Sequence, residues 1–535
     1  MTRYLHIEML KRVFSIFTYL FVLFADPAVG GSFRVKIGSQ ITHEVSPYVY
    51  GLNLDRRDRT HRSVWQLNPG SYRFGGNTSS RYNWKINSWN TGKDWFFANF
   101  SSRTPKKVDY FMRQNVDKAV SSLVTLPLLG WVAKDNFSAS FPTKKFKNQP
   151  HSKKGAGNGV DANGKLLKAD PKDCCVKINM DFIKEWVMHL KGQFGSYPHH
   201  YIIGNEPMLW WKTHRDVHPE PATYAEILEK FVEMAQVVRK TDKQAVIVGP
   251  ALWGWMAMQN SSMDEKSDWN GWKRGTDRAN HQNQPFLEWF LKEIVQREKK
   301  LGMSLLDVVD VHYYPEGKDL RNGRPSSNRN RNLRIAATRS LWDKSYDDKS
   351  WIDEKIYFIP RLQELARKYK PSLKVAIGEY NFRGEKDIAG GVVQAEVLGV
   401  FAYTGLYSAN YWTVPPRDSY PFQAFKIFRN YDNQMSTFGR EYLQNDFGIQ
   451  QVASVFSAKD TSARRLTLVV INKDLKQKHS FLIDVSSHTS KPKKVNHFFF
   501  TEKLRGAINQ ESLAISTDLS VQVEPLSVNL FEITY

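Results

Sequence analysis

Eight short runs of apolar and β-branched residues recur along the first 414 residues of the chain, and each has the length of a buried strand. They lie at 48–54, 72–76, 123–131, 201–206, 245–250, 308–314, 374–380 and 408–414. Most are followed by segments with helical spacing of apolar residues, at 108–120, 180–194, 221–239, 285–299, 355–369, 389–404 and 422–433. Strands that alternate with helices favour parallel βαβ units. Eight such units close into a (β/α)8 barrel, the TIM-barrel fold, with its functional groups at the carboxyl ends of the strands.

The pattern changes after about residue 445, where short alternating strands follow one another without helices between them. These strands lie at 450–457, 465–472, 480–485, 494–501 and 521–533. This spacing is typical of a β-sandwich, which residues 31–47 are expected to join as an N-terminal strand. The predicted fold class is therefore α/β, with a catalytic-type barrel at 48–445 and a β-sandwich domain at 446–535.

The N-terminus has the layout of a secretory signal peptide. Lys11 and Arg12 precede the apolar run 13–24, and small residues follow up to Gly30. The run is short for a membrane span. We expect residues 1–30 to be removed and the mature protein to be secreted to the extracellular space, free of the membrane.

Two of the eight predicted strands end at a glutamate. Glu206 follows Asn205 at the end of the fourth strand, and Glu379 ends the seventh. Each could be a solvated turn residue on its own. Two carboxylates at the same end of a barrel, however, form the pair that glycoside hydrolysis requires, one to protonate the leaving oxygen and one to attack the sugar carbon.

The end of the sixth predicted strand carries two further candidates. His312 and Tyr314 share one face by strand alternation, and the seventh strand is adjacent, so they are placed to orient Glu379 or to contact a ligand. His312 has the alternative of a satisfied buried histidine. We find no partners for it at metal-ligand spacing, so the sequence assigns no metal ligands.

Glycines and aromatic residues mark the expected rim. Two glycines lie in the sequence RFGGN at 73–77, which predicts a backbone that passes close to a ligand, with Asn77 and Trp84 at the rim. The chain has 16 tryptophans, and the flat faces of sugar rings stack on such rings. Trp351 and Trp412 are candidate stacking platforms.

Charge and cysteine content refine the picture. The 76 basic and 54 acidic residues give a formal charge of +22, but the basic residues are scattered and no nucleic-acid module is present. A solvated surface is the favoured interpretation, with adhesion to a polyanion left open.

The two cysteines, Cys174 and Cys175, are adjacent, and a bridge between neighbours is strained, so the fold does not depend on a disulfide framework.

A series of motifs between about residue 50 and residue 472 resembles glycoside hydrolase family 44. In order they are RFGGN, YNW, DWFFA, GNEP, HYYPE, GEYN, FRNYD and TFG. The resemblance implies a barrel with a β-sandwich and retaining cleavage of β-1,4-glucans such as cellulose derivatives and xyloglucan. It implies Glu206 as acid/base, Glu379 as nucleophile, and Asn205, Trp84 and Trp412 around the sugar. It requires no cofactor and allows a structural metal such as calcium.

The expected function is therefore that of a secreted, monomeric endo-β-1,4-glucanase with a polysaccharide substrate and no nucleic-acid partner. Two alternatives stay open. A heparanase-like hydrolase of an acidic glycan would suit the positive charge, and basic residues in the cleft would support it. A catalytically silent glycan-binding protein would bind polysaccharide without releasing reducing ends.

Overall fold

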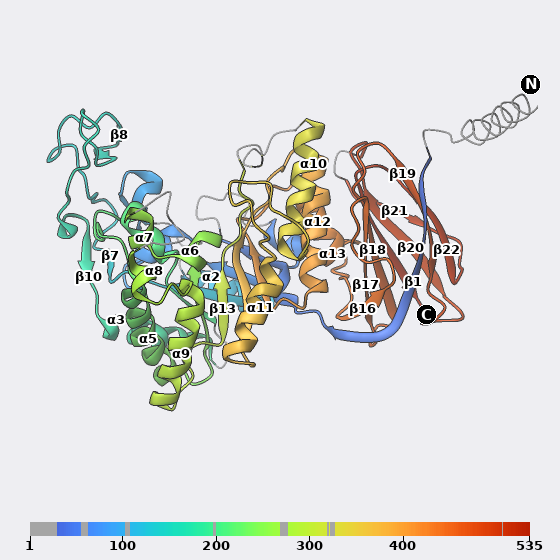
Figure 1. The fold of residues 1–535 in the computed structure, drawn as a ribbon, viewed down its shortest axis with the longest axis horizontal. Coiled ribbons are helices and arrows are strands. Elements are labelled where there is room, and N and C mark those ends of the chain that lie inside the picture. The colour runs from blue at the N-terminus through green and yellow to red at the C-terminus, as the bar shows by residue number, and fades with distance from the viewer. Residues whose placement is uncertain are drawn as a thin grey trace, which may run out of the picture. The chain divides into compact units, whose positions relative to one another are not determined.

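The structure, a computed structural model, describes residues 29–54, 63–101, 108–195, 200–267, 276–317, 320, 327–504 and 507–535. It divides into two compact units, His43–Tyr442 and a second made of the chain before residue 43 together with Leu443–Tyr535 (Figure 1). The predicted limits of the barrel were 48 and 445, a few residues later at each end. The observed limits fall within β1 (Val29–Glu44) and β16 (Glu441–Asn445). The predicted signal peptide lies, apart from its last two residues, outside the described residues.

The first unit contains the predicted (β/α)8 barrel, which is confirmed. Its strands pair in chain order, and each recorded pair within the barrel is parallel. They are β2 (Gly51–Asn53), β3 (Ser71–Phe74), β6 (Ser121–Leu126), β11 (His200–Ile203), β12 (Val246–Leu252), β13 (Val308–Val311), β14 (Lys374–Tyr380) and β15 (Ser408–Tyr411). Nearly every residue of these strands is buried, which is why they appear in the sequence as continuous apolar runs rather than as alternating patterns.

Helices follow most of the strands. They include α2 (Val108–Asp117), α3 (Met180–Phe194), α5 (Tyr224–Thr241), α9 (Phe286–Leu301), α11 (Phe358–Tyr369), α12 (Ile388–Tyr403) and α13 (Tyr420–Arg429). Local chemistry sets their ends: the Thr223 side chain accepts the Glu226 N–H at the start of α5, and α3 stops at Gly195, whose φ is 67°. α12 is apolar on all sides because its residues are buried from end to end except the last. In the described ranges, no helix is long and apolar enough to cross a membrane.

Strand lengths differ from the sequence prediction where proline intervenes. The run predicted as one strand at 123–131 is divided into β6 and β7 (Trp131–Ala133), because Pro127 has no N–H to continue the ladder. β7 pairs instead with β10 (Cys175–Lys177), at the far end of a long excursion that separates the third and fourth barrel strands. This excursion also contains the short hairpin β8 (Ser152–Lys153) and β9 (Ala156–Gly157).

The second unit is a mixed sheet of nine strands in the order β21-β20-β23-β18-β17-β16-β1-β19-β22. After β16 these are β17 (Ala453–Asp460), β18 (Arg465–Asn472), β19 (Lys478–Asp484), β20 (Lys494–Phe500), β21 (Asn509–Ser512), β22 (Asp518–Val523) and β23 (Ser527–Thr534). β1 joins the sheet parallel to β19, so the N-terminal strand lies beside strands from the end of the chain, as predicted (Figure 1). Side chains from strands throughout the order, such as Val35, Leu468, Phe481 and Phe531, share one apolar core, so the sheet folds over itself in the sandwich manner.

Candidate active site

The two predicted glutamates come together at the carboxyl end of the barrel. Glu206 follows β11, the fourth strand, and Glu379 lies near the end of β14, the seventh. One carboxylate oxygen of each glutamate and one ring nitrogen of His312 all lie within 4.8 Å of one another. Glu379 is 5% exposed, whereas the Glu206 side chain retains 20% of its exposure. The pair is therefore largely screened from water, and Glu206 is its accessible member.

The backbone turns sharply at Glu206. Its φ and ψ are 45° and 54°, in the left-handed region, and Pro207 begins a short 3-10 helix immediately afterwards. The Glu206 N–H donates to the carbonyl of Ala251 on the neighbouring strand β12, at 2.9 Å. A left-handed conformation costs a non-glycine residue about 1–3 kcal/mol and persists where the surrounding structure holds it. The backbone of Glu206 is thus held in place by its neighbours. A freely solvated turn residue, the alternative interpretation, would not be held in this way.

Arg73 of β3, which the sequence analysis did not select, connects the site. Its side chain is fully buried. Nη1 donates to Oε1 of Glu379 at 2.6 Å and to Oδ1 of Asn53 at 2.8 Å, and Nη2 donates to Oδ1 of Asn205 at 2.9 Å. A buried arginine needs a charged partner, so an arginine within a strand predicted to be buried was a signal available in the sequence.

His312 and Tyr314 reach the same two carboxylates. Nδ1 of His312 lies 2.8 Å from Oε1 of Glu206 and 3.7 Å from Oε2 of Glu379. The Tyr314 hydroxyl donates to Oε2 of Glu379 at 2.9 Å. Each oxygen of Glu379 therefore faces a donor, Arg73 on one side and Tyr314 on the other. His312 is buried, as its alternative interpretation held, but its hydrogen bond goes to Glu206.

The same burial leads to opposite protonation of the two glutamates. Burial and the nearby negative charge of Glu379 raise the pKa of Glu206, although His312 opposes this. For Glu379 burial acts in the same direction, but the charges of His312 and Arg73 and the hydrogen bonds from Arg73 and Tyr314 outweigh it and lower its pKa. The two pKa values are thus pushed apart, so Glu206 keeps its proton to higher pH than Glu379 does, which is the division of roles that acid–base chemistry on a glycosidic bond requires.

The two glycines after β3 make room for protein side chains. A Cβ on Gly75 would lie 2.4 Å from Cζ of Arg73, and a Cβ on Gly76 would lie 2.1 Å from the ring of Trp412. The space that these glycines leave in the Cβ direction is filled by the guanidinium and by the indole, and a close approach of this backbone to a ligand stays a prediction. Trp412 is held against the turn that begins with Gly76.

We expect Gly76→Ala to destabilise the protein more than Gly130→Ala. Both glycines have positive φ, 78° and 88°, so both changes strain the backbone, but beyond its chain neighbours no atom of the described residues lies within 4 Å of a Cβ at Gly130. Overlap with Trp412 should add about 1–3 kcal/mol to the cost at Gly76. Urea unfolding of the two variants measures the difference, and equal costs would show that Trp412 moves aside freely.

Two of the predicted rim residues, Trp84 and Asn77, contact parts of the chain other than the two glutamates. Trp84 stacks on His189 of α3, with ring centroids 5.1 Å apart, and also packs against Phe182 of that helix. Asn77 begins the 3-10 helix η3 (Asn77–Arg81), and its side chain donates to the carbonyl of Thr91 at 3.4 Å. The recorded contacts of Trp84 and Asn77 are therefore with neighbouring elements rather than with the glutamates.

Trp351 lines a groove that also includes Met208, two positions after Glu206 in the sequence. It is 53% exposed, and its Nε1 donates to Oε2 of Glu316 at 3.2 Å. The groove has a volume of about 140 Å³, and its lining starts two residues after Glu206. The lining residues are Met208, Trp253, Met256, Ala257, Asn260, Ser261, Glu265 and Trp351. Two tryptophans and two methionines make this a mainly apolar surface with one acidic member.

The Glu206, His312 and Glu379 group is also the one set of three or more potential metal ligands found in the described part of the chain. It does not fit calcium, which takes six to eight oxygen ligands, because one of its three members is an imidazole. The guanidinium of Arg73 at 2.6 Å from Glu379 would also repel a cation. A structural calcium ion elsewhere stays a prediction.

A (β/α)8 barrel that carries a glutamic acid after its fourth strand and a glutamate on its seventh defines the class of barrel glycoside hydrolases. The sequence profile of glycoside hydrolase family 44 matches residues 88–317. Endoglucanase A of Paenibacillus lautus is 30% identical over 458 residues, which cover 80% of this chain and 62% of that protein.

Solved structures give the same result over nearly the whole chain. CelM2, a bifunctional glucanase-xylanase protein from a metagenome library, is 33% identical with a TM-score of 0.87, covering 94% of this chain and 99% of that one. A Paenibacillus polymyxa xyloglucanase from family 44 is 26% identical with a TM-score of 0.77, covering 94% and 100%. This chain belongs to glycoside hydrolase family 44. It spans less than two thirds of the length of the curated relatives that it matches, 62% of one and 34% of another.

Proposed function

We propose that this protein is a retaining endo-β-1,4-glucanase that acts on cellulose-type glucans or on xyloglucan. The observation that carries the proposal is the closeness of the two glutamates, since one carboxylate oxygen of Glu206 lies within 4.8 Å of one carboxylate oxygen of Glu379. Carboxyl groups about 5–5.5 Å apart are typical of retaining enzymes, and those about 6.5–9.5 Å apart leave room for the water that inversion needs. The similar proteins named endoglucanase and xyloglucanase support the substrate class.

The reaction follows from the protonation states. Glu379, held ionised, attacks the anomeric carbon, while Glu206 gives its proton to the departing glycosidic oxygen. This forms a glycosyl-enzyme ester at Glu379 and frees one half of the polymer. Glu206, now ionised, then removes a proton from water, which attacks the same carbon and releases the sugar with its original configuration.

His312 is suited to the change of charge during this cycle. Its ring lies between the glutamates, and the negative charge of Glu379 together with the hydrogen bond to Glu206 raises its pKa against the effect of burial. When Glu379 becomes a neutral ester and Glu206 becomes an anion, the negative charge moves from one partner of His312 to the other. When it is protonated, the imidazole, 2.8 Å from Glu206 and 3.7 Å from Glu379, stabilises both states of the pair.

The polar and apolar surfaces around the glutamates favour a neutral sugar polymer. Asn205 uses Oδ1 for Arg73, and its buried Nδ2 has no hydrogen-bond partner among the described residues, so it is free to donate to a sugar hydroxyl. Trp253 and Trp351 line the groove that includes Met208, and its eight lining residues include Glu265 and no lysine or arginine. This lining does not suit the acidic glycan of the heparanase-like alternative.

Secretion is a further part of the proposal. It is supported by the basic, apolar and small-residue layout of the first 30 residues, which matches a cleavable signal peptide. An endo-acting enzyme must meet a polymer that is too large to enter a cell. Expression of the full chain with a C-terminal tag, followed by N-terminal sequencing of protein from the medium, tests this; a new N-terminus near Gly30 is expected.

The pH dependence of kcat/KM should be bell-shaped. Glu379 must be ionised, so activity is lost as the pH falls through its pKa, which is lowered from the ordinary value of 4.5. Glu206 must be protonated, so activity is lost as the pH rises through its pKa, which is raised above 4.5. The two limbs should therefore lie on opposite sides of 4.5. In Glu206→Gln the basic limb should disappear, and its persistence would assign that limb to another group.

The release of new reducing ends from a panel of polymers tests the function itself. Xyloglucan, carboxymethylcellulose, mannan and heparan sulfate are treated with the purified protein, with Glu379→Gln as the control. Release from a neutral β-1,4-glucan that the control abolishes is the expected result. Release from heparan sulfate alone would contradict the proposal and support the heparanase-like alternative. Binding without release from any polymer would leave a silent glycan-binding protein.

A further inference from the structure

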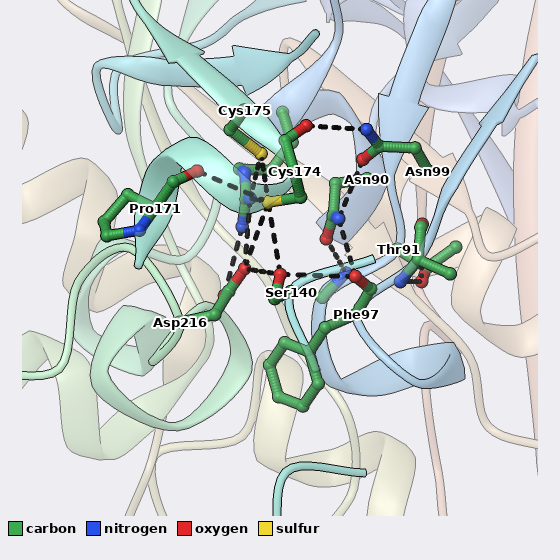
Figure 2. Close-up of polar contacts among 12 residues, drawn as sticks. Asn90, Thr91, Phe97, Asn99, Ser140, Pro171, Cys174, Cys175 and Asp216 are labelled. Atoms are coloured by element: carbon green, nitrogen blue, oxygen red, sulfur yellow. Dashed lines mark hydrogen bonds and ion pairs between the residues drawn. The ribbon is translucent and has the colours of Figure 1, made fainter. Parts of the chain in front are cut away.

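Away from the glutamates, the adjacent cysteines lie in a buried polar cluster that the proposed hydrolysis does not use. Cys174 is 0% exposed and Cys175 is 2% exposed, and both are free thiols with sulfur atoms 2.6 Å apart. Figure 2 shows them converging with Ser140 and Asp216. The backbone around them is fixed, since the Cys174 carbonyl accepts from Asn99 at 2.6 Å. The dithiol is therefore held in one arrangement.

The guanidinium of Arg81 is the cation of this cluster, and it faces two acidic groups, the carboxylate of Asp216 and the thiol of Cys175. Its Nη1 and Nη2 lie 3.2 and 3.1 Å from the two oxygens of Asp216, and Nη2 also donates to Sγ of Cys175 at 2.6 Å. Both Arg81 and Asp216 have fully buried side chains. Ser140 donates to Asp216 and, at 3.2 Å, to Sγ of Cys174. Nη2 also lies 3.3 Å from Sγ of Cys174, so one guanidinium is shared between a carboxylate and both sulfur atoms.

The two thiols differ because of the hydrogen bond between them, since the charge of Arg81 acts to lower the pKa of both. Burial opposes ionisation of Cys175, but the hydrogen bond from Cys174 and the charge of Arg81 prevail and lower the pKa of its thiol. Burial and the same hydrogen bond raise the pKa of the Cys174 thiol well above its usual value. A thiolate is the reactive form of cysteine, and a thiolate beside a thiol is the arrangement of redox-active pairs.

We propose that Cys174 and Cys175 form a reversible two-electron redox site that takes a small peroxide as its oxidant. The Cys175 sulfur attacks one peroxide oxygen, the O–O bond breaks, and water leaves, which gives a sulfenic acid on Cys175. The Cys174 sulfur then attacks Cys175, loses its proton and expels a second water as the S–S bond forms. In sum, two thiols and one hydrogen peroxide give one disulfide and two waters.

The surroundings accommodate the oxidised form. The sulfur atoms are 2.6 Å apart and a disulfide bond is about 2.05 Å long, so the bond forms with little movement. Oxidation removes the acidic thiol, which leaves Arg81 paired with Asp216 alone, one positive charge with one negative charge. A bridge between neighbouring residues is strained and therefore easily reduced. Because both sulfurs are buried, a molecule as small as hydrogen peroxide suits the site better than a bulky disulfide.

Counting thiols by mass spectrometry tests the proposal directly, because the chain has no other cysteines. The full-length protein is reduced, freed of reductant, treated with hydrogen peroxide in its folded state, and then denatured, alkylated and digested with trypsin. The peptide 173–177 carries both cysteines, since lysines precede and end it. Before treatment it should take up two alkyl groups. After treatment it should take up none and be lighter by two hydrogen atoms, and dithiothreitol should restore both.

Two serine variants separate the roles of the sulfurs. In Cys174→Ser the Cys175 sulfenic acid has no second thiol and should be trapped by dimedone, whereas the wild-type protein should trap little. In Cys175→Ser the remaining thiol should oxidise more slowly than in Cys174→Ser. Thiols that persist at peroxide concentrations that oxidise the denatured chain would overturn the proposal. Oxygen addition that dithiothreitol cannot reverse, or a disulfide between two chains, would overturn it as well.

Discussion

Replacing Glu379 with glutamine is expected to lower kcat on a β-1,4-glucan by about 10⁴- to 10⁶-fold, the range seen when an enzyme loses its nucleophile. Glutamine keeps the shape of the side chain, and its single amide oxygen can accept from Arg73 or from Tyr314, but a neutral amide does not attack an anomeric carbon. Steady-state assays of released reducing ends measure the loss. Circular dichroism of the variant should match the wild-type spectrum, which would assign the loss to chemistry rather than to folding.

Glu206→Gln is the matched variant, because it removes the acid but leaves the nucleophile. With the polymer, whose leaving group needs a proton, activity should fall by about 10²- to 10⁴-fold. With an aryl cello-oligosaccharide whose leaving group needs no proton, the first step should proceed and the second should not. The glycosyl-enzyme should then accumulate, and intact-mass spectrometry should show one sugar adduct on the chain.

The double variant Glu206→Gln, Glu379→Gln should show no adduct, since no nucleophile remains. An adduct in the double variant would place the nucleophile elsewhere. Proton NMR shows which anomer the wild-type enzyme releases first. An inverted anomer would show that water attacks in a single displacement and that no glycosyl-enzyme forms.

The barrel and its paired glutamates could be predicted because both follow from rules that act along the chain. Parallel strands covered on both faces give continuous apolar runs, and the runs of β11 and β14 each reach a glutamate. The carboxyl ends of barrel strands meet at one end, so two glutamates that are far apart in sequence were expected to be close together. The structure brings them within 4.8 Å.

Contacts across the barrel could not be predicted in this way. The guanidinium of Arg73 reaches Glu379 306 residues further along the chain, and this pairing depends on which strands face each other across the interior. The same holds for Gly76 and Trp412, which come from opposite ends of the first unit's sequence and share one small space. Sequence position alone also suggested a rim location for Trp84, whereas its ring packs on α3.

The dithiol cluster shows the same limit. Adjacent cysteines were visible in the sequence, but their chemistry depends on Arg81 from η3 and on Asp216, 135 residues later, which meet them only in the folded chain. Arg73 and Arg81 lie eight residues apart and serve two separate anions, Glu379 and Asp216. A buried arginine is thus the feature that indicates both the glutamate site and the dithiol cluster.

Replacing Arg73 with methionine is the second change with a large expected effect. Methionine fills part of the space but leaves Glu379 buried without its cation, and breaking a buried pair from one side costs about 3–5 kcal/mol of stability. Without Arg73 the depressed pKa of Glu379 should rise, because burial then acts with less opposition. The nucleophile would be protonated at higher pH, so the acidic limb of the kcat/KM profile should move towards neutral pH.

The sign of the stability change follows from the same linkage. In the wild-type protein the lowered pKa of Glu379 contributes stability that is present above the ordinary value of 4.5 and is lost as the pH falls through the lowered pKa. In Arg73→Met this contribution is smaller, because only His312 and Tyr314 then lower the pKa, so the difference in unfolding free energy between the two proteins should be largest near neutral pH and shrink as the pH falls below 4.5.

Urea unfolding and kcat/KM profiles at matched pH values measure both effects, and Arg73→Lys is the control that keeps the charge. Lysine cannot bridge Glu379, Asn53 and Asn205 at once, so it should restore the acidic limb but only part of the activity. If the limb stays in place in Arg73→Met, then His312 and Tyr314 alone hold Glu379 ionised. Arg73 would in that case act on stability and on the position of Asn205, and the charge that prepares the nucleophile would come from the imidazole between the two glutamates.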